Sequence, residues 1–565
     1  MRLSSVSIVL SALSLLIANP SQAQPANSCA DPYWKYTLRC AFFPTQLPQP
    51  VTDEPQAPED LKDYTRVFLT EDTGIRCMDG TAPLMYVDKA ICTNLAGCDR
   101  GARYGDPIES NRWLFTVPGG GSCAAETCAE IYAVPDERGE MGSAGKPSMK
   151  NMDGIHLPDP KLNPVFASYN RVRIEKCSYD RYMGRAAQEA AGGYFHGTQP
   201  GGGKIDYNLY YHGFLIIEQA FKALENGLHY STWRLNESVK RRACCSHTGA
   251  TTTGNSGQKV IHAEEKLPPL ADAEVVLFAG HSGGCHGLFH NIDNIAATLA
   301  GIPGFKGDVR ALFDENFLPS VENEAAFAST APGGSDAYSG ITSGVSSSNN
   351  SGRFTYDASS AFTTDLNVQQ YNIWHSVLDA SCMEVHGATE PWKCADRHHV
   401  LLNHIGTPFL AREDFRDPNT EHLNGGKGHQ LRWAAPSNYP NCPSGEPCDP
   451  ILDAAEFRAR LEEQASTFLQ FAQTRSEIGK GTDRTFAVSG TLPTSYLWMP
   501  QCARHDGAYD NASFYKTVIS TSATAYSLRQ WLEQFMSAPR LGVRAWQIDG
   551  LTDSAGRFAR TTQCQ

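Results

Sequence analysis

An apolar segment that ends in a glycine-rich turn constrains the fold more than any other feature of this sequence. Residues 275–279 read VVLFA and predict a buried β-strand, and residues 287–301 have the apolar spacing of an α-helix. The segment GHSGG at 280–284 lies between them and matches G-x-S-x-G. Strand, motif and helix in this order are typical of the turn that presents a nucleophilic serine in α/β hydrolases. We therefore expect Ser282 to be a nucleophile and the N–H of Gly283 to bind an oxyanion, the alternative being a glycine-rich turn with an incidental serine.

Other apolar segments alternate with helical patterns along the chain. Strands alternating with helices predict an α/β fold, here an α/β-hydrolase-like fold with a mostly parallel central sheet flanked by helices. The expected strands are 66–70, 112–117, 171–177, 273–280, 399–405 and 407–411. The expected helices, besides 287–301, are 211–228, 455–475 and 522–537.

The N-terminus has the pattern of a secretory signal peptide. Arg2 precedes an apolar run over residues 6–18, and small residues follow up to Ala23. No later segment approaches the ~18 continuous apolar residues of a membrane span. The net charge of −13 argues against nucleic acid as a partner. We expect a secreted or periplasmic protein without a membrane span.

The predicted domain organisation is simple. Residues 1–23 form the signal peptide, 24–64 a proline-rich arm, and 65–565 a single catalytic domain. Segments rich in Gly, Ser, Asn, Pro or Cys predict disulfide-stapled or loop insertions in that domain, near 245–265, 329–352 and 435–450.

All 17 cysteines lie after residue 23. In an oxidising compartment most of them should form disulfides. The close pairs Cys123/Cys128 and Cys442/Cys448 lack the paired C-x-x-C spacing of structural zinc sites, which also favours disulfides. An odd count leaves at least one cysteine outside intramolecular pairs, and Cys285 is a candidate for a buried free thiol.

Three further features complete a possible hydrolase site. The glycines 119–121 follow the expected strand 112–117, where such enzymes have a second source of oxyanion N–H groups, although three glycines alone also make a flexible turn. His505 lies late in the chain, and hydrolases of this class run serine, acid, histidine in order. Asp414 and Asp417 follow the expected strand 407–411 and are the candidate acids.

Metal chemistry is the alternative for the histidines that follow the motif. His286 and His290 are four residues apart and would share one helix face. No glutamate follows His286 as in H-E-x-x-H, so we expect no metal site and no cofactor.

The chain resembles the pectin acetylesterase and Notum family of secreted serine carboxylesterases. Its markers, in order, are CMDGTAP (77–83), GGGSC (119–123), NPVFASYNRVRIEKC (163–177), YYHGFLIIEQAFKAL (210–224), GHSGGCHG (280–287), TPFLAREDFRD (407–417) and QCARH (501–505). The resemblance implies Ser282 as nucleophile, His505 as base and Asp417 as acid, with Asp414 in reserve. It also implies an oxyanion hole from the N–H groups of Gly121, Ser122 and Gly283.

Two positions depart from the family pattern. Ser122 stands where the family usually has tryptophan, and Arg416 stands where an aromatic residue usually precedes the acid. The first departure bears on acyl-group specificity and the second on the identity of the acid.

The resemblance implies hydrolysis of O-acetyl groups on pectin or a related polysaccharide, through an acyl-enzyme. The partner expected is therefore an acylated polysaccharide or a small ester. The alternatives are an extracellular lipid or polyester esterase, and an inactive carbohydrate-binding protein with the same fold.

Overall fold

A long, mostly parallel sheet forms the centre of the protein. The computed structural model describes residues 64–315, 374–415, 493–548 and 561–563, with gaps inside these stretches, together with Ala465. Within them, the pairs from β5 through β3, β10, β11, β12 and β13 to β16 are parallel, and β2, β1 and β4 extend the sheet by antiparallel pairing. In spatial order the strands are β16 (Arg544–Ile548), β13 (Ser495–Met499), β12 (Phe409–Arg412), β11 (Asp308–Asp314), β10 (Val275–His281), β3 (Arg112–Val117), β5 (Asn170–Ile174), β2 (Leu84–Asp88), β1 (Tyr64–Phe68) and β4 (Met149–Lys150).

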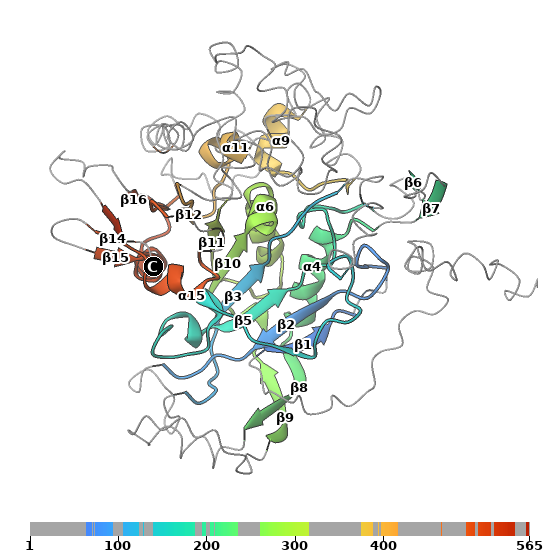
Figure 1. Cartoon of the computed structure of the whole chain (residues 1–565), viewed down its shortest axis with the longest axis horizontal. Coiled ribbons are helices and arrows are strands. Elements are labelled where there is room, and N and C mark those ends of the chain that lie inside the picture. The colour runs from blue at the N-terminus through green and yellow to red at the C-terminus, as the bar shows by residue number, and fades with distance from the viewer. Residues whose placement is uncertain are drawn as a thin grey trace, which may run out of the picture.

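Helices cover both faces of this sheet and confirm the α/β-hydrolase-like architecture. Side chains alternate between the faces of each strand, so Phe115, Phe278 and Phe313 pack in one core with α4 and α6. Leu114 and Leu277 belong to a second core with α16. Figure 1 shows α4 and α6 beside the central strands and α15 toward the C-terminal elements. The described helices are α4 (Gly213–Leu224), α6 (Ser282–Ala300), α9 (Ala380–His386), α11 (Arg397–Asn403), α15 (Asn511–Tyr515) and α16 (Leu528–Ser537).

Short elements complete the described parts. The strands β8 (Leu228–Leu235) and β9 (Val260–Leu267) form an antiparallel pair, so part of the insertion expected near 245–265 is a strand. The remaining strands are β6 (Phe195–Thr198), β7 (Lys204–Tyr207), β14 (Val518–Ser520), β15 (Ala525–Ser527) and β17 (Thr561–Gln563), and short 3₁₀ helices span Gly154–His156, Phe166–Ser168 and Leu270–Asp272.

One expected strand is wrong. Residues 399–405 were predicted to be extended, but Arg397–Asn403 form α11. Val400 and Leu401 are adjacent and both are buried in the core. A short apolar run of this kind fits a buried helix as well as a buried strand, because it is too short to show a period. The expected helix 455–475 lies outside the described residues except for Ala465.

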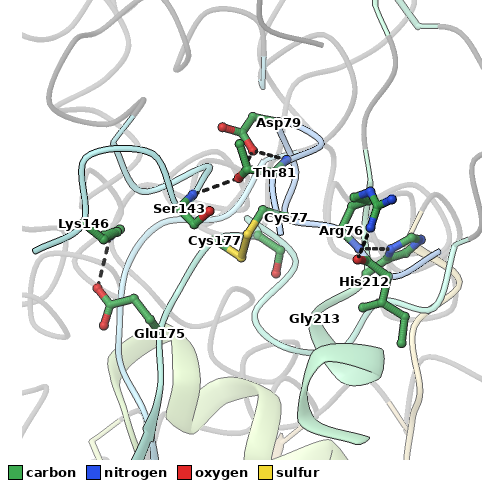
Figure 2. The surroundings of a disulfide bond; sticks show 12 residues. Arg76, Cys77, Asp79, Thr81, Ser143, Lys146, Glu175, Cys177, His212 and Gly213 are labelled. Atoms are coloured by element: carbon green, nitrogen blue, oxygen red, sulfur yellow. Dashed lines mark hydrogen bonds and ion pairs between the residues drawn. A yellow bond between two sulfur atoms is a disulfide. The ribbon is translucent and has the colours of Figure 1, made fainter. Parts of the chain in front are cut away.

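Disulfides confirm the prediction for the close pair Cys123–Cys128. A second disulfide joins Cys382 to Cys394, and a third joins Cys77 to Cys177 across 100 residues (Figure 2). Among the described cysteines, Cys285 is buried and forms no disulfide, as expected. The pair Cys442/Cys448 lies outside the described residues.

The predicted N-terminal segments and two of the insertions also lie outside the described residues: 1–23, nearly all of 24–64, 329–352 and 435–450. None of the helices in the described part of the chain is both long and apolar enough to cross a membrane.

Glu175 is expected to make stability depend on pH. Its buried carboxylate lies 3.1 Å from Lys146 Nζ, near the Cys77–Cys177 disulfide (Figure 2). It also lies 3.5 Å from Lys150 Nζ and 3.1 Å from Arg173 Nε. Burial acts to raise the pKa of Glu175, but the charges of Arg173 and Lys146 prevail and lower it from 4.5 to about 2. The folded protein therefore favours the carboxylate. Its contribution to stability is complete above pH 4.5 and is lost as the pH falls toward 2.

Glu175→Gln should therefore lower the free energy of unfolding at pH 7 by about 3 kcal/mol. The difference from the wild type should shrink as the pH falls below 4.5. Urea unfolding of both proteins over this pH range measures it. Equal stabilities at pH 7 would contradict the prediction.

Candidate active site

Ser282 occupies the turn between β10 and α6. β10 ends at His281, and Ser282 is the first residue of the helix. Its φ of 50° lies in the left-handed region, which a residue with a side chain seldom adopts. Backbone strain of this kind is concentrated at functional sites, where the surrounding structure maintains it. The turn therefore has the geometry that the motif predicted.

The glycines of the motif are required by close packing. A Cβ atom added to Gly284 would lie 2.4 Å from the carbonyl oxygen of Val117, and one added to Gly283 would lie 2.2 Å from that of Gly120. Both distances are shorter than a real contact allows, and both partners are backbone atoms. The turn at Ser282 can thus approach β3 and the loop after it only because these positions lack side chains.

The glycine loop 119–121 lies directly against the turn at Ser282. β3 pairs in parallel with β10, with Val117 opposite Gly280, so the segments after the two strands leave the sheet side by side. A Cβ added to Gly119 would lie 3.1 Å from Ser282 Oγ. Gly120 has a φ of 132°, a conformation that favours glycine. Sequence reasoning therefore located a loop that the fold brings to the serine.

His281 supports this loop. The N–H of Gly119 lies 3.2 Å from a ring nitrogen of His281 and donates a hydrogen bond to it. The ring also packs on Tyr509, with 4.3 Å between centroids. Burial, followed by the charges of Arg173 and His505, holds the pKa of His281 well below its usual value. A neutral imidazole can accept this hydrogen bond, so His281 positions the loop.

His505 follows β13 and contacts an acid that sequence reasoning missed. Its Nδ1 lies 2.6 Å from Oε2 of Glu315, which comes directly after β11. The segment 308–314 was not predicted to be a strand, so the acid at its end carried no signal. The parallel strands β10, β11 and β13 all end at the same edge of the sheet, which brings the segments with Ser282, Glu315 and His505 to one side.

The two acids expected from the sequence are placed differently. Asp414 is buried, and its Oδ1 lies 2.6 Å from Nη2 of Arg412. Asp417 lies outside the described residues. Of the expected oxyanion residues, Gly121 and Ser122 are half-buried in the loop after β3, and Gly283 packs against that loop.

The described residues contain one group with metal-ligand types close together. The ligand atoms of Cys382, His399 and His404 lie within 4.8 Å of one another. Cys382 is joined to Cys394, so its sulfur is not the thiolate that a metal would bind. The other histidine pair, His286 and His290, is buried in α6 with 5.4 Å between ring centroids.

Part of the chain is similar to known proteins. Residues 56–233 match the family model described as Pectinacetylesterase. The chain is 29% identical over 128 residues to the palmitoleoyl-protein carboxylesterase NOTUM of Schmidtea mediterranea, covering 22% of this chain and 21% of that protein. It is 25% identical over 268 residues to the human protein of the same name, covering 47% and 38%.

A solved structure of the Wnt deacylase Notum from Drosophila also matches, with 16% identity and a TM-score of 0.48, over 85% of this chain and 96% of that chain. The sequence alignments are shorter. They span about a fifth of the planarian relative and two fifths of the human one.

Proposed function

We propose that the chain is a secreted serine carboxylesterase, because residues 56–233 match the Pectinacetylesterase family model and parts of the chain are similar to Notum carboxylesterases. The observation that carries this proposal is the strained backbone of Ser282 with the glycine loop against it. A serine held in this way has its Oγ next to backbone that can bind an oxyanion.

The reaction proceeds through an acyl-enzyme. His505 takes the proton of Ser282 as Oγ attacks the ester carbonyl, and the negative oxygen binds the N–H groups of Gly121, Ser122 and Gly283. The intermediate collapses, and the alcohol leaves with the proton that His505 returns. Water then attacks the acyl-enzyme by the same route and releases the acid.

Polar groups beside the loop favour a short acyl group on a hydrophilic substrate. A Cβ added to Gly120 would lie 1.8 Å from Lys176 Nζ, and that ammonium group lies 2.7 Å from the carboxylate of Glu140. Tyr179 packs against Gly121 and lies under the same ammonium group. Ser122 replaces the aromatic side chain usual in the family. An O-acetylated polysaccharide such as pectin fits these surroundings better than a long acyl chain, which would leave the charged groups poorly solvated.

Long acyl esters are the second candidate, because the Notum relatives are named palmitoleoyl-protein carboxylesterases. A lipid or polyester substrate would belong to the same class.

A chain-length series separates these candidates. Nitrophenyl esters from acetate to palmitate and acetyl release from pectin and xylan would be measured with one enzyme preparation. The proposal expects the highest kcat/KM with acetate, together with acetyl release from a polysaccharide. A preference for long chains would support the lipid-type candidate. No turnover of any ester would overturn the proposal and favour the inactive alternative, for which binding to pectin would then be measured.

A further inference from the structure

A buried cluster of charged side chains lies at the carboxyl ends of β11 and β12. Arg412 Nη1 lies 2.9 Å from Oδ1 of Asp314 and 2.6 Å from Oε1 of Glu315, and Nη2 lies 2.6 Å from Oδ1 of Asp414. Each of these side chains is at most 2% exposed. Burial alone would lower the pKa of Arg412, but the carboxylates hold it well above its usual value. One guanidinium faces three carboxylates, so with all of them ionised this group is negative overall.

Glu315 joins this cluster to the proposed base. One carboxylate oxygen contacts Arg412, and the other lies 2.6 Å from Nδ1 of His505. With a partner on each oxygen, the carboxylate is held in one orientation. A carboxylate at Nδ1 keeps the proton on that nitrogen, which leaves the lone pair of Nε2 to accept a proton from a serine.

The backbone of Glu315 is also held in place. Its φ is 76°, so it shares the left-handed conformation of Ser282. The N–H of Glu315 donates to the carbonyl oxygen of Arg412 at 2.8 Å. The carbonyl oxygen of Glu315 accepts a hydrogen bond of 2.8 Å from the thiol of Cys285. His281 pairs with Asp314 in the sheet, so Ser282 and Glu315 follow paired residues on adjacent strands. Strain maintained by this many contacts is typical of a functional position.

The same cluster holds the loop that carries His505. Oδ2 of Asp314 accepts a hydrogen bond of 2.9 Å from the N–H of Ala508. Gly507 lies against Arg412, because a Cβ added there would be 2.1 Å from the guanidinium carbon. The loop and the carboxylate that faces His505 are therefore fixed by one arginine and its acids.

We propose that Glu315, oriented by Arg412, is the carboxylate that positions His505, in place of an acid after β12. This inference rests on the proposed esterase function. When His505 takes the proton of Ser282 it becomes positively charged, and the negative cluster stabilises that charge. Glu315 keeps its negative charge throughout and acts on the reaction through His505.

Glu315→Gln tests the inference because it removes the charge and keeps the size. With nitrophenyl acetate, kcat should fall by about 10⁴-fold while KM stays near the wild-type value. Asp88→Asn is the matched control, since it removes a buried carboxylate from Arg171, an arginine outside this cluster, and should lower stability far more than kcat. Proton NMR adds a second readout: the low-field signal of a histidine N–H bound to a carboxylate should be present in the wild type and the control, and absent in Glu315→Gln.

Asp417→Asn decides the outcome even if Glu315→Gln does not fold. The inference expects this variant to retain most of the wild-type kcat. A loss of kcat in Asp417→Asn comparable to that expected for Glu315→Gln would overturn the inference and leave the esterase function standing. The same holds if Glu315→Gln folds and keeps the wild-type kcat. An inactive wild-type enzyme, by contrast, would overturn the proposed function itself.

Discussion

Replacing Ser282 with glycine is expected to abolish ester hydrolysis and to stabilise the fold at the same time. Loss of the nucleophile in a serine hydrolase lowers kcat by about 10⁶-fold. The φ of 50° at this position is strained for serine and readily adopted by glycine. Relief of the strain stabilises the folded protein, and the greater flexibility of glycine in the unfolded chain offsets part of that gain. The net effect should be a rise of about 1 kcal/mol in the free energy of unfolding.

Ser282→Ala is the control that separates the two effects. It removes the same hydroxyl but keeps a Cβ in the strained conformation, so it should lose activity without the gain in stability. Nitrophenyl acetate turnover and urea unfolding of the three proteins measure both quantities. Turnover that persists in Ser282→Gly would place the nucleophile elsewhere. Equal stability of the glycine and alanine variants would show that the turn stores no strain.

The second large effect is expected from the Cys77–Cys177 disulfide. It closes a loop of 100 residues, whereas Cys123–Cys128 closes one of five. In the loop-entropy model these closures stabilise the fold by about 5 and about 2 kcal/mol, respectively. The long closure also ties the segment after β5 to the segment before β2, near the ion pair of Lys146 with Glu175 (Figure 2).

The double variant Cys77→Ser/Cys177→Ser should therefore unfold at a much lower urea concentration than Cys123→Ser/Cys128→Ser. The short disulfide follows the glycine loop directly, so its removal should affect kcat more than stability. Unfolding curves and ester turnover of both variants test this. Equal losses of stability would show that loop length does not set the contribution of these disulfides.

The serine turn could be predicted from the sequence because its signals are local. The strand, the glycines and the helix lie within 275–301, and the close contacts of Gly283 and Gly284 explain why the motif needs small residues. The glycine loop carried a similar signal, since it directly follows the buried strand β3. The pairing of β3 with β10 then brings the two segments together.

The contact between Glu315 and His505 could not be found in this way. Glu315 and His505 are 190 positions apart, and their contact depends on the order of β11, β12 and β13 in the sheet. A sequence shows which segments are strands more readily than which strands are neighbours. Chain order and family resemblance pointed instead to Asp417, which lies outside the described residues. Residues 399–405 were misassigned for a different reason, because seven residues do not establish a period.

Covalent labelling tests most directly the central claim, that Ser282 is the nucleophile of an esterase. The protein would be treated with a fluorophosphonate, which reacts with activated serines, and its peptides would be analysed by mass spectrometry. The proposed function predicts one adduct on Ser282, and the inference about Glu315 predicts that this adduct forms much more slowly in Glu315→Gln. If the enzyme hydrolyses esters but its adduct is on another residue, or Ser282 carries none, the proposed function is contradicted.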